Sequence, residues 1–146
     1  MVAATNSNEF QSVVFHLNTE LYGIDIFRVH EIIRLREITP IPKTPKHIRG
    51  LVNLRGKTIP VIDLRMKLTM PVTDDSDSTR IIVVEAEQGS IGLVVDSVKE
   101  VITIHKEEME EAPALVAAGK SDFVLGLAKQ GETLITLIDL DKALAA

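Results

Sequence analysis

The sequence predicts a mostly β protein whose two halves each fold as a small barrel of about five strands. Runs of five or six branched aliphatic residues alternate with turn signals along most of the 146 residues, a pattern that favours small barrels over a layered α/β fold. Parts of the first half recur in the second half at constant spacings. Apolar residues make up 45% of the chain, and because one small barrel cannot bury so much apolar surface, we expect a shared apolar core.

The chain begins with a polar stretch and continues as three short strands. Residues 1–12 are expected to form a flexible tail, and they lack the basic and apolar pattern of a secretory signal. Residues 29–33 alternate apolar and polar side chains over too short a distance to separate a strand from a short helix, and we favour a strand. The strands expected here cover residues 13–17, 21–26 and 29–33.

A proline-rich connection follows, and it predicts one of the few short helices. Thr44 can cap a helix whose first position is Pro45, and Gly50 would end that helix. The chain then continues as two strands joined by a tight turn, with the strands over residues 51–54 and 59–64 and the turn over residues 55–58.

An acidic, serine-rich stretch over residues 72–79 is the best candidate for a boundary between the lobes. We therefore expect lobes over about residues 13–71 and 80–140, within one domain over residues 13–146. Exchange of strands between the lobes is left open.

The second half predicts a hairpin, three further strands and a helix at the end of the chain. Asp139 or Asp141 can cap that helix, which would begin near residue 141. Residues 106–111 form a charged stretch that is expected to face solvent. The hairpin covers residues 80–85 and 91–95, and the other strands cover residues 101–104, 121–127 and 133–140.

The internal repeat rests on glycines and acidic residues as well as on aliphatic ones. The pair Gly50 and Gly126, 76 residues apart, is accompanied at the same spacing by Leu51 with Leu127, Ile59 with Ile135, Ile62 with Ile138, Asp63 with Asp139 and Leu64 with Leu140. Gly23, Val29, Glu31 and Ile33 recur 69 residues later as Gly92, Val98, Glu100 and Ile102. Aliphatic matches arise by chance between strands, but glycine and carboxylate matches in register favour a duplication.

No pattern in the sequence predicts catalysis, a cofactor or a metal. The chain has no cysteine and no G-x-S-x-G motif. Gly56-Lys57-Thr58 resembles the end of a phosphate-binding loop, but Leu51 stands where that motif needs its first glycine. The histidines show no metal-binding spacing; they are His16, His30, His47 and His105.

Carboxylates that follow strands have two interpretations. The structural one is that Asp caps nearby backbone N–H groups, and the repetition of Asp63 as Asp139 favours it. The alternative is an enzyme or a ligand-binding barrel that uses Asp25, Asp63 and His30 in a cleft. The net charge of −5 and the 3% of aromatic residues argue against binding to nucleic acid. No apolar run is long enough to span a membrane, and direct membrane binding is not expected.

Several motifs together resemble the CheW family of bacterial chemotaxis coupling proteins. They are Tyr-Gly-Ile-Asp-Ile at residues 22–26, Val29-x-Glu31-Ile32, Thr44-Pro45 with Ile48-x-Gly50, Val-Asn-Leu-Arg-Gly at residues 52–56, Ile-Pro-Val-Ile-Asp-Leu-Arg at residues 59–65, and Ile-Gly-Leu-Val-Val-Asp at residues 91–96 before Val98. The likeness extends from about Phe10 to Leu140, and the order of these motifs is specific.

The resemblance implies two SH3-like five-stranded barrels and an adaptor without catalytic activity or cofactor. The partners would be the regulatory domain of the histidine kinase CheA and the cytoplasmic tip of methyl-accepting chemoreceptors. The protein would be cytoplasmic, monomeric when free, and recruited through these partners to membrane-associated arrays. The partner-binding residues would be Val29, Glu31, Ile32, Asn53 and Arg55.

Two other members of this signalling system are alternatives to a stand-alone coupler. The kinase regulatory domain has the same fold, but the short terminal stretches favour a small complete protein over a fragment of the kinase. A fused relative of the CheV type would carry a receiver segment, which the sequence does not show.

Arg55 is the candidate that the repeat itself singles out. It lies in the turn between two apolar strands, and its repeat mate is Gly131, so the basic turn belongs to one lobe only. A solvated arginine, or one paired with a local carboxylate such as Asp63, is the structural alternative. An arginine at a solvent-facing turn can also give two parallel hydrogen bonds to a partner carboxylate, which lysine cannot reproduce.

The absence of cofactor motifs generates a test on the purified protein. Zinc, ATP and NAD should each leave the thermal unfolding midpoint unchanged. A ligand present at about 100 times its Kd would stabilise the fold by about 2.7 kcal/mol, which a thermal melt detects. An upward shift with any of the three would contradict the prediction.

Overall fold

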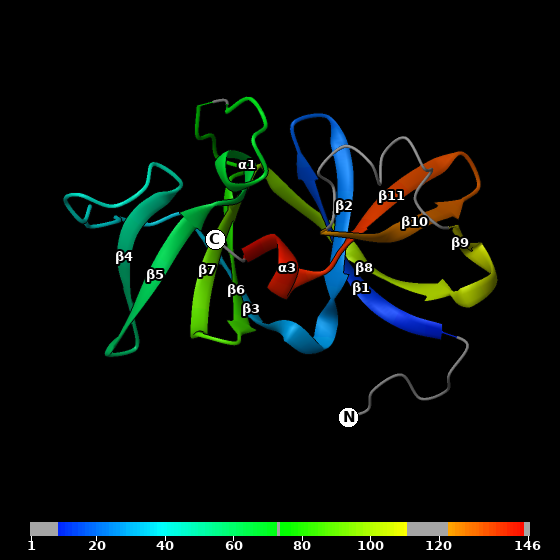
Figure 1. Cartoon of the computed structure of the whole chain (residues 1–146), viewed down its shortest axis with the longest axis horizontal. Coiled ribbons are helices and arrows are strands. Elements are labelled where there is room, and N and C mark those ends of the chain that lie inside the picture. The colour runs from blue at the N-terminus through cyan, green and yellow to red at the C-terminus, as the bar shows by residue number, and fades with distance from the viewer. Residues whose placement is uncertain (1–8, 73, 111–122, 145–146) are drawn as a thin grey trace.

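The computed structural model describes residues 9–72, 74–110 and 123–144, and its strands form two sheets (Figure 1). The first sheet contains β1 (Glu9–Leu17), β2 (Glu20–Asp25), β8 (Ser97–His105), β9 (Met109–Glu110), β10 (Val124–Gln130) and β11 (Thr133–Ile138). The second contains β3 (Val29–Arg34), β4 (Ile48–Leu54), β5 (Lys57–Asp63), β6 (Arg80–Ala86) and β7 (Gly89–Val95). We call them the six-stranded lobe and the five-stranded lobe.

The helices are short, as the sequence predicts. Those in the described part of the chain are the 3-10 turns η1 (Ile26–Arg28) and η2 (Lys106–Glu108) and the α-helices α1 (Leu64–Lys67) and α3 (Leu140–Leu144). The predicted fold class, mostly β with two small lobes and few short helices, is confirmed.

The strand order confirms the repeat and shows that the two repeats exchange strands. The orders are β8-β1-β2-β11-β10-β9 and β3-β6-β7-β5-β4. β5 runs parallel to β7, with Val61 opposite Gly92, and β11 runs parallel to β2, with Leu137 opposite Gly23. The first repeat therefore gives β1 and β2 to one lobe and β3 to β5 to the other, and the second repeat does the reverse.

The division into lobes differs from the predicted one at residues 72–79. The five-stranded lobe is continuous in sequence from β3 to β7, whereas the six-stranded lobe combines β1 and β2 with β8 to β11. The acidic stretch separates the two repeats but not the two lobes. The possibility of strand exchange, which the sequence left open, is the arrangement found.

The glycines at the two parallel contacts leave no room for a side chain. A Cβ atom on Gly23 would lie 2.5 Å from the Ser12 hydroxyl oxygen, and one on Gly92 would lie 2.8 Å from the Ile81 Cγ2 atom. Both glycines sit where a strand of one repeat joins a strand of the other. In each case the nearest atom belongs to a side chain of the antiparallel neighbour from the same repeat, Ser12 on β1 or Ile81 on β6. Ser12 and Ile81 are themselves 69 positions apart, so the same side-chain crowding explains both members of this repeated pair of glycines.

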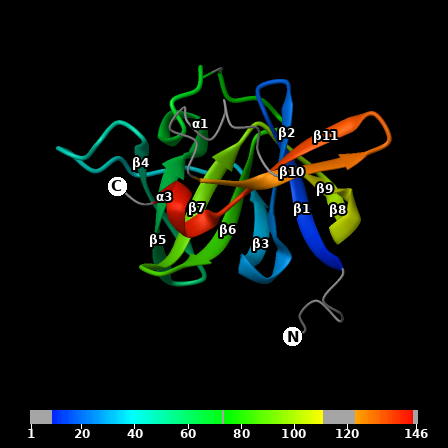
Figure 2. The same ribbon diagram turned by 45° about the vertical axis from the view of Figure 1, so that its right-hand side comes forward.

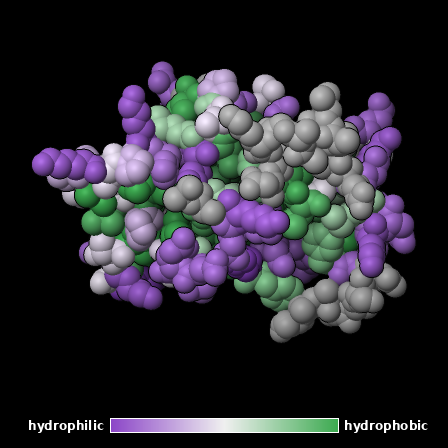
Figure 3. Space-filling view, in the orientation of Figure 1, coloured by the Kyte–Doolittle hydropathy of each residue, from purple (hydrophilic) through white to green (hydrophobic). Residues whose placement is uncertain are grey.

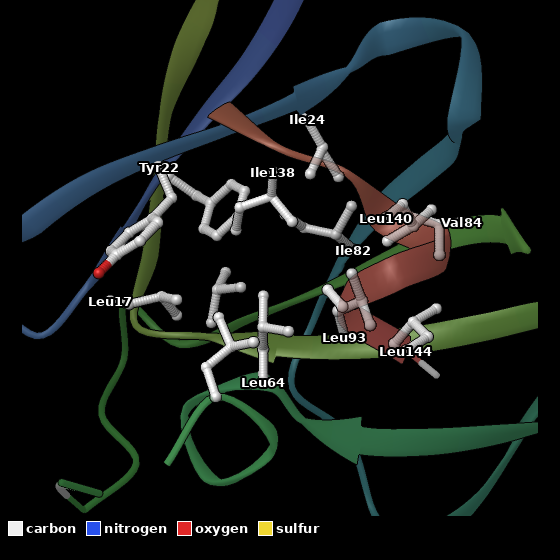
Figure 4. Packing of buried hydrophobic residues seen from close by; sticks show 14 of the residues in the cluster. Leu17, Tyr22, Ile24, Leu64, Ile82, Val84, Leu93, Ile138, Leu140 and Leu144 are labelled. Atoms are coloured by element: carbon white, nitrogen blue, oxygen red, sulfur yellow. The ribbon is translucent and has the colours of Figure 1, made fainter. Parts of the chain in front are cut away.

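One apolar cluster spans the junction between the lobes. Leu17 and Ile24 come from the six-stranded lobe and Ile82 and Leu93 from the five-stranded lobe, and all four are buried (Figure 4). Leu144 of α3 joins them, since α3 follows β11 and lies against the five-stranded lobe in both orientations (Figure 1, Figure 2). The expected shared core is present, and each fully buried side chain of this size contributes about 1.5–3 kcal/mol.

Two predicted elements, the short helix between Thr44 and Gly50 and the final strand, differ from the structure. Thr44 donates its hydroxyl to the Ile41 carbonyl oxygen and caps no helix. Gly50 lies inside β4 at a φ of 143°, where a Cβ atom would lie 2.1 Å from the Thr39 carbonyl oxygen. The expected final strand ends at Ile138, and α3 follows it.

Asp139 is the residue that begins α3, as one of the two predicted caps. Its side chain accepts a hydrogen bond from the Lys142 backbone N–H at 3.2 Å. Its repeat mate Asp63 caps α1 through the backbone N–H of Arg65 at 3.0 Å. The helix α1 is absent from the sequence-based prediction, although the match between the two aspartates carried the signal.

The predicted ends of two other segments also change. Residues 9–12, placed in the tail, belong to β1 and pair with β8. The rest of that tail, residues 1–8, lies outside the described residues, as do residues 121–122 of the strand predicted over residues 121–127. β10 begins at Val124 and continues to Gln130.

A buried arginine fixes the place where the chain crosses between the lobes. Arg65 is fully buried, and its guanidinium donates to the Asp63 carboxylate at 2.9 and 3.1 Å and to Asp96 at 2.6 Å. Asp96 lies between β7 and β8, where the chain leaves the five-stranded lobe, and it also accepts the Asn18 backbone N–H. Arg65 therefore links α1 to the crossover and to the turn after β1.

A counterpart of this link lies at the other crossover with the charges reversed. Arg28, in η1 between β2 and β3, donates two hydrogen bonds to Asp141, the repeat mate of Arg65. This second pair is partly exposed, with about a third of each side chain accessible. The two pairs occupy similar places and differ chiefly in burial.

Replacement of Arg65 by Met should lower the free energy of unfolding by about 3–5 kcal/mol, because it removes the two hydrogen bonds of the guanidinium to the buried Asp63 carboxylate and leaves only Arg49, at 3.9 Å, as a cation beside it. Arg28→Gln is the matched control, and because its ion pair is partly exposed we expect a much smaller loss. Urea unfolding followed by far-UV circular dichroism measures both. Equal losses for the two variants would contradict the structural role assigned to Arg65.

Candidate functional site

The two outer strands of the five-stranded lobe carry the predicted partner-binding residues. β3 bears Val29, Glu31 and Ile32, and Asn53 and Arg55 lie at the hairpin between β4 and β5. In the sheet order, β3 and β4 stand at opposite edges. A bridge between Thr39 and Leu51 brings the chain after β3 back to β4, so the lobe closes and its two edges meet.

The hairpin turn holds Arg55 in a left-handed backbone conformation. Leu54 pairs with Lys57, so Arg55 and Gly56 alone form the turn, with φ angles of 52° and 83°. Positive φ at both central residues is the pattern of a type I′ turn, for which Asn-Gly is the usual sequence. The Asn53 side chain supports the turn by accepting the Gly56 backbone N–H at 3.1 Å. Arg55 thus places a long cationic side chain at a position where Asn or Gly would adopt the positive φ angle at lower cost.

Glu31 binds the Arg55 guanidinium through both carboxylate oxygens. The two N···O distances are 2.5 and 2.8 Å. The guanidinium keeps the pKa of Glu31 below its usual range, and the carboxylate raises the pKa of Arg55. Arg55 remains 72% exposed and Glu31 25% exposed. Because exposed ion pairs stabilise folds only weakly, the main effect of this pair is to hold the arginine in one direction.

Further charged groups surround this pair. His30 lies 2.7 Å from the Glu85 carboxylate across β3 and β6, and this contact lowers the pKa of Glu85. Arg36 donates to the Asn53 carbonyl oxygen at 3.3 Å. Beside them is a shallow depression of about 270 Å³ that is lined in part by the apolar side chains Leu54, Ile59 and Val83. We call this depression, with Glu31 and Arg55, the Arg55 mouth.

The five predicted residues are distributed over more than one surface. Glu31, Asn53 and Arg55 come together at the Arg55 mouth. Ile32, next to Glu31 on the strand, points to the opposite side and is 38% exposed. Val29 is half-buried and packs against the shared core, which favours a packing role for this residue.

The residues of the alternative catalytic cleft do not come together. Asp25 accepts the Phe27 backbone N–H, Asp63 holds Arg65, and His30 pairs with Glu85. Within residues 9–72, 74–110 and 123–144, no group of His, Asp and Glu could hold a metal ion. In the same part of the chain, no helix is long and apolar enough to cross a membrane.

The pairing of Glu31 with Arg55 is not evident from the sequence. Both residues are candidates there, but Asp63 is the local carboxylate that the sequence offers to Arg55, and Asp63 is occupied by Arg65. Glu31 and Arg55 are 24 positions apart, and the sequence does not show their contact because it depends on closure of the lobe. The only signal in the sequence is that both lie on or beside strands of the same repeat.

Surface hydropathy shows where protein contacts can form. In the orientation of Figure 1, hydrophilic residues cover much of the middle of the visible face, and hydrophobic residues reach the surface on both sides of it (Figure 3). Of the residues that the structure describes, the large exposed apolar ones are Phe27, Ile32, Met66, Val72, Val101, Leu125 and Leu134. Scattered apolar side chains next to charged ones are suited to contacts with other proteins.

Comparison with known proteins supplies the family. The sequence model of the CheW-like domain matches residues 11–146. The chain belongs to the CheW family. The match covers the two lobes and the Arg55 mouth, so the resemblance found from the motifs is confirmed.

Named relatives of this CheW-family chain agree in length as well as in sequence. The chemotaxis protein CheW of Klebsiella aerogenes is 35% identical over 146 residues, which are 100% of this chain and 87% of that protein. CheW of Bacillus subtilis is 34% identical over 144 residues, which are 99% of this chain and 92% of that protein. The crystal structure of the scaffolding protein TtCheW from Thermoanaerobacter tengcongensis has a TM-score of 0.85 and 42% identity, and the match covers 94% of this chain and 93% of that one.

Proposed function

We propose that this CheW-family chain is a non-catalytic adaptor that couples chemoreceptors to the histidine kinase CheA. The observation that supports this most directly is an exposed arginine fixed by Glu31 on a turn whose backbone would favour a smaller residue. TtCheW, a relative of known structure, is a scaffolding protein, and that agrees with an adaptor. The partners are the kinase regulatory domain and the cytoplasmic receptor tip.

The chemistry of the Arg55 mouth suits recognition of a carboxylate. A guanidinium has five N–H groups, and Glu31 accepts two of them. Other N–H groups can therefore donate to an acidic side chain of a partner without loss of the internal pair. Since Glu31 already limits the rotamers of Arg55, binding costs less side-chain entropy than it would for a free arginine.

The proposed location follows from the partners. The chain would be cytoplasmic and monomeric when free, and it would reach the membrane only through receptors assembled in arrays. The net charge of −5 opposes adsorption to anionic lipid.

Arg55→Glu should fold normally and lose at least about tenfold in affinity for the kinase domain or the receptor tip, which corresponds to about 1.4 kcal/mol. Calorimetric titration measures the affinity, and a circular-dichroism melt measures the fold. Glu31→Lys should weaken binding for the related reason that it releases and repels Arg55. Arg55→Asn is the control for the turn, because Asn accepts the left-handed conformation, and it should melt no lower than the wild-type chain.

The double variant Glu31→Lys with Arg55→Glu separates two causes of such a loss. It restores an internal ion pair but presents a carboxylate to the partner. If Arg55 contacts a partner carboxylate, binding stays weak in the double variant. Recovery of affinity would show that local repulsion caused the loss, and retained binding of both partners by Arg55→Glu would remove Arg55 from the site.

The proposed location gives a second test, with liposomes. The purified chain should stay in the supernatant with anionic liposomes, because it has neither a basic amphipathic helix in its sequence nor a positive net charge. It should sediment with the same liposomes once receptor-tip fragments are attached to them. Sedimentation with bare liposomes would contradict recruitment through partners.

A further inference from the structure

The Arg55 mouth has a counterpart in the six-stranded lobe. A smaller depression of about 90 Å³ lies there, and its lining follows from that of the Arg55 mouth by the two repeat spacings. Glu31 corresponds to Glu100, and Ile59 corresponds to Ile135. The other corresponding pairs in the two linings are His30 with Lys99, Leu54 with Gln130, Lys57 with Thr133, Val83 with Val14 and Ser90 with Leu21. We call this second depression the Glu100 mouth.

The backbone around the two carboxylates is the same in both lobes. Glu31 lies opposite Val83 and Glu100 lies opposite Val14, and in both places the register shifts at this point through a β-bulge. The side chains that follow a bulge are redirected. In each lobe, therefore, a bulged strand pair directs one carboxylate, Glu31 or Glu100, toward the depression of that lobe.

The two mouths differ at the turn that supplies the cation. Arg55 occupies the first turn position in one lobe, and Gly131 occupies the matching position in the other. Their φ angles are 52° and 62°, and a Cβ atom on Gly131 would meet nothing within 4 Å. Among the described residues, Glu100 has no ion pair or hydrogen bond from a side chain, although Lys99 adjoins it in sequence. The six-stranded lobe thus has the carboxylate but lacks the internal guanidinium.

We infer that the Glu100 mouth is a docking site for an arginine side chain presented by another protein. The guanidinium would take the place that Arg55 takes on Glu31 and would bind the Glu100 carboxylate with two parallel hydrogen bonds. The methylene groups of that arginine would lie on Val14, Leu21 and Ile135, which line the depression. An exposed carboxylate over an apolar floor is complementary to a guanidinium in both charge and shape.

This site is distinct from the Arg55 mouth in position and in charge. The Arg55 mouth offers a cation to a partner carboxylate, whereas the Glu100 mouth offers a carboxylate to a partner cation. The two lobes would therefore bind surfaces of opposite charge. The choice of kinase regulatory domain and receptor tip as the proteins to test rests on the proposed function.

Gly131→Arg tests the inference by filling the mouth from within. The variant should fold, since Arg55 shows that the turn accepts an arginine, and its crystal structure should show the introduced guanidinium on both oxygens of Glu100. This internal cation should block the partner, as should Glu100→Gln, which removes the charge. We expect each variant to lower the affinity for one of the two partners at least about fivefold.

Two controls accompany these variants. Gly131→Asn also replaces the glycine at this positive φ angle by a residue with a side chain, but it adds no charge. It should bind the partners as the wild-type chain does. Glu107→Gln removes an exposed carboxylate from η2, outside the mouth, and should also leave binding unchanged. A shared loss in all four variants would overturn the inference, because it would point to net charge or to the turn backbone.

The outcomes separate this inference from the proposed function. If the wild-type chain binds a partner and Glu100→Gln and Gly131→Arg bind both partners equally well, the inference is wrong and the adaptor function stands. If the wild-type chain binds neither partner, the proposed function is wrong. In that case the crystal structure of Gly131→Arg tests the guanidinium site. An introduced arginine side chain that points to solvent instead of to Glu100 would overturn the inference.

Discussion

Neither repeat of this chain can complete a lobe alone, because β3 and β5 of the first repeat pair with β6 and β7 of the second, and β8 and β11 of the second repeat pair with β1 and β2 of the first. The exchange passes through two parallel contacts, at Gly23 and Gly92, where a Cβ atom would collide with the side chain of Ser12 or Ile81 on the neighbouring antiparallel strand. It also places one apolar cluster across both lobes. The lobes are therefore expected to form together, and their relative orientation is fixed by the same pairings that build the sheets.

The crossovers carry the main ionic contacts of this arrangement. Arg65 with Asp96 and Arg28 with Asp141 each join a helix after the last strand of a repeat to a place where the chain changes lobe. Burial separates their roles, because a charge that is fully withdrawn from water must keep its partner, whereas a partly exposed pair is replaceable. In this duplicated fold, the buried ion pair at one crossover is needed to hold the two halves together, whereas the residues of the partly exposed pair at the other crossover can be replaced.

The sequence predicted this fold well where the pattern is local and poorly where it depends on pairing over distance. Alternation of aliphatic runs with turns located nearly every strand, and the match of Asp63 with Asp139 pointed to the helix cap. The exchange of strands could not be decided, since the parallel contacts of β5 and β11 look the same whichever repeat supplies their partners. The predicted helix near Pro45 failed because Gly50 is needed inside β4, where Thr39 approaches its backbone.

The candidate site shows the same limit in one pair of residues. Glu31 and Arg55 could be selected from the resemblance and from the turn, but their contact requires that β3 and the hairpin after β4 meet when the lobe closes. Once that contact is known, the comparison between lobes acquires a physical meaning. Glu31 and Glu100 follow equivalent bulges, one in each lobe. The duplicated fold therefore has the carboxylate in both lobes and differs between them at the turn opposite it.

That variation argues for recognition rather than for stability. Gly131 satisfies the left-handed turn without cost, and its lobe closes without an arginine. The arginine at the matching turn is therefore not needed to close a lobe of this design, and an exposed pair adds little to the free energy of unfolding. Arg55 gives the five-stranded lobe a fixed cation. The six-stranded lobe has no arginine at the matching turn, and its Glu100 carboxylate stays accessible. Two nearly equivalent lobes thereby acquire different surfaces, and the proposed adaptor function requires such a difference if the chain is to distinguish two partners.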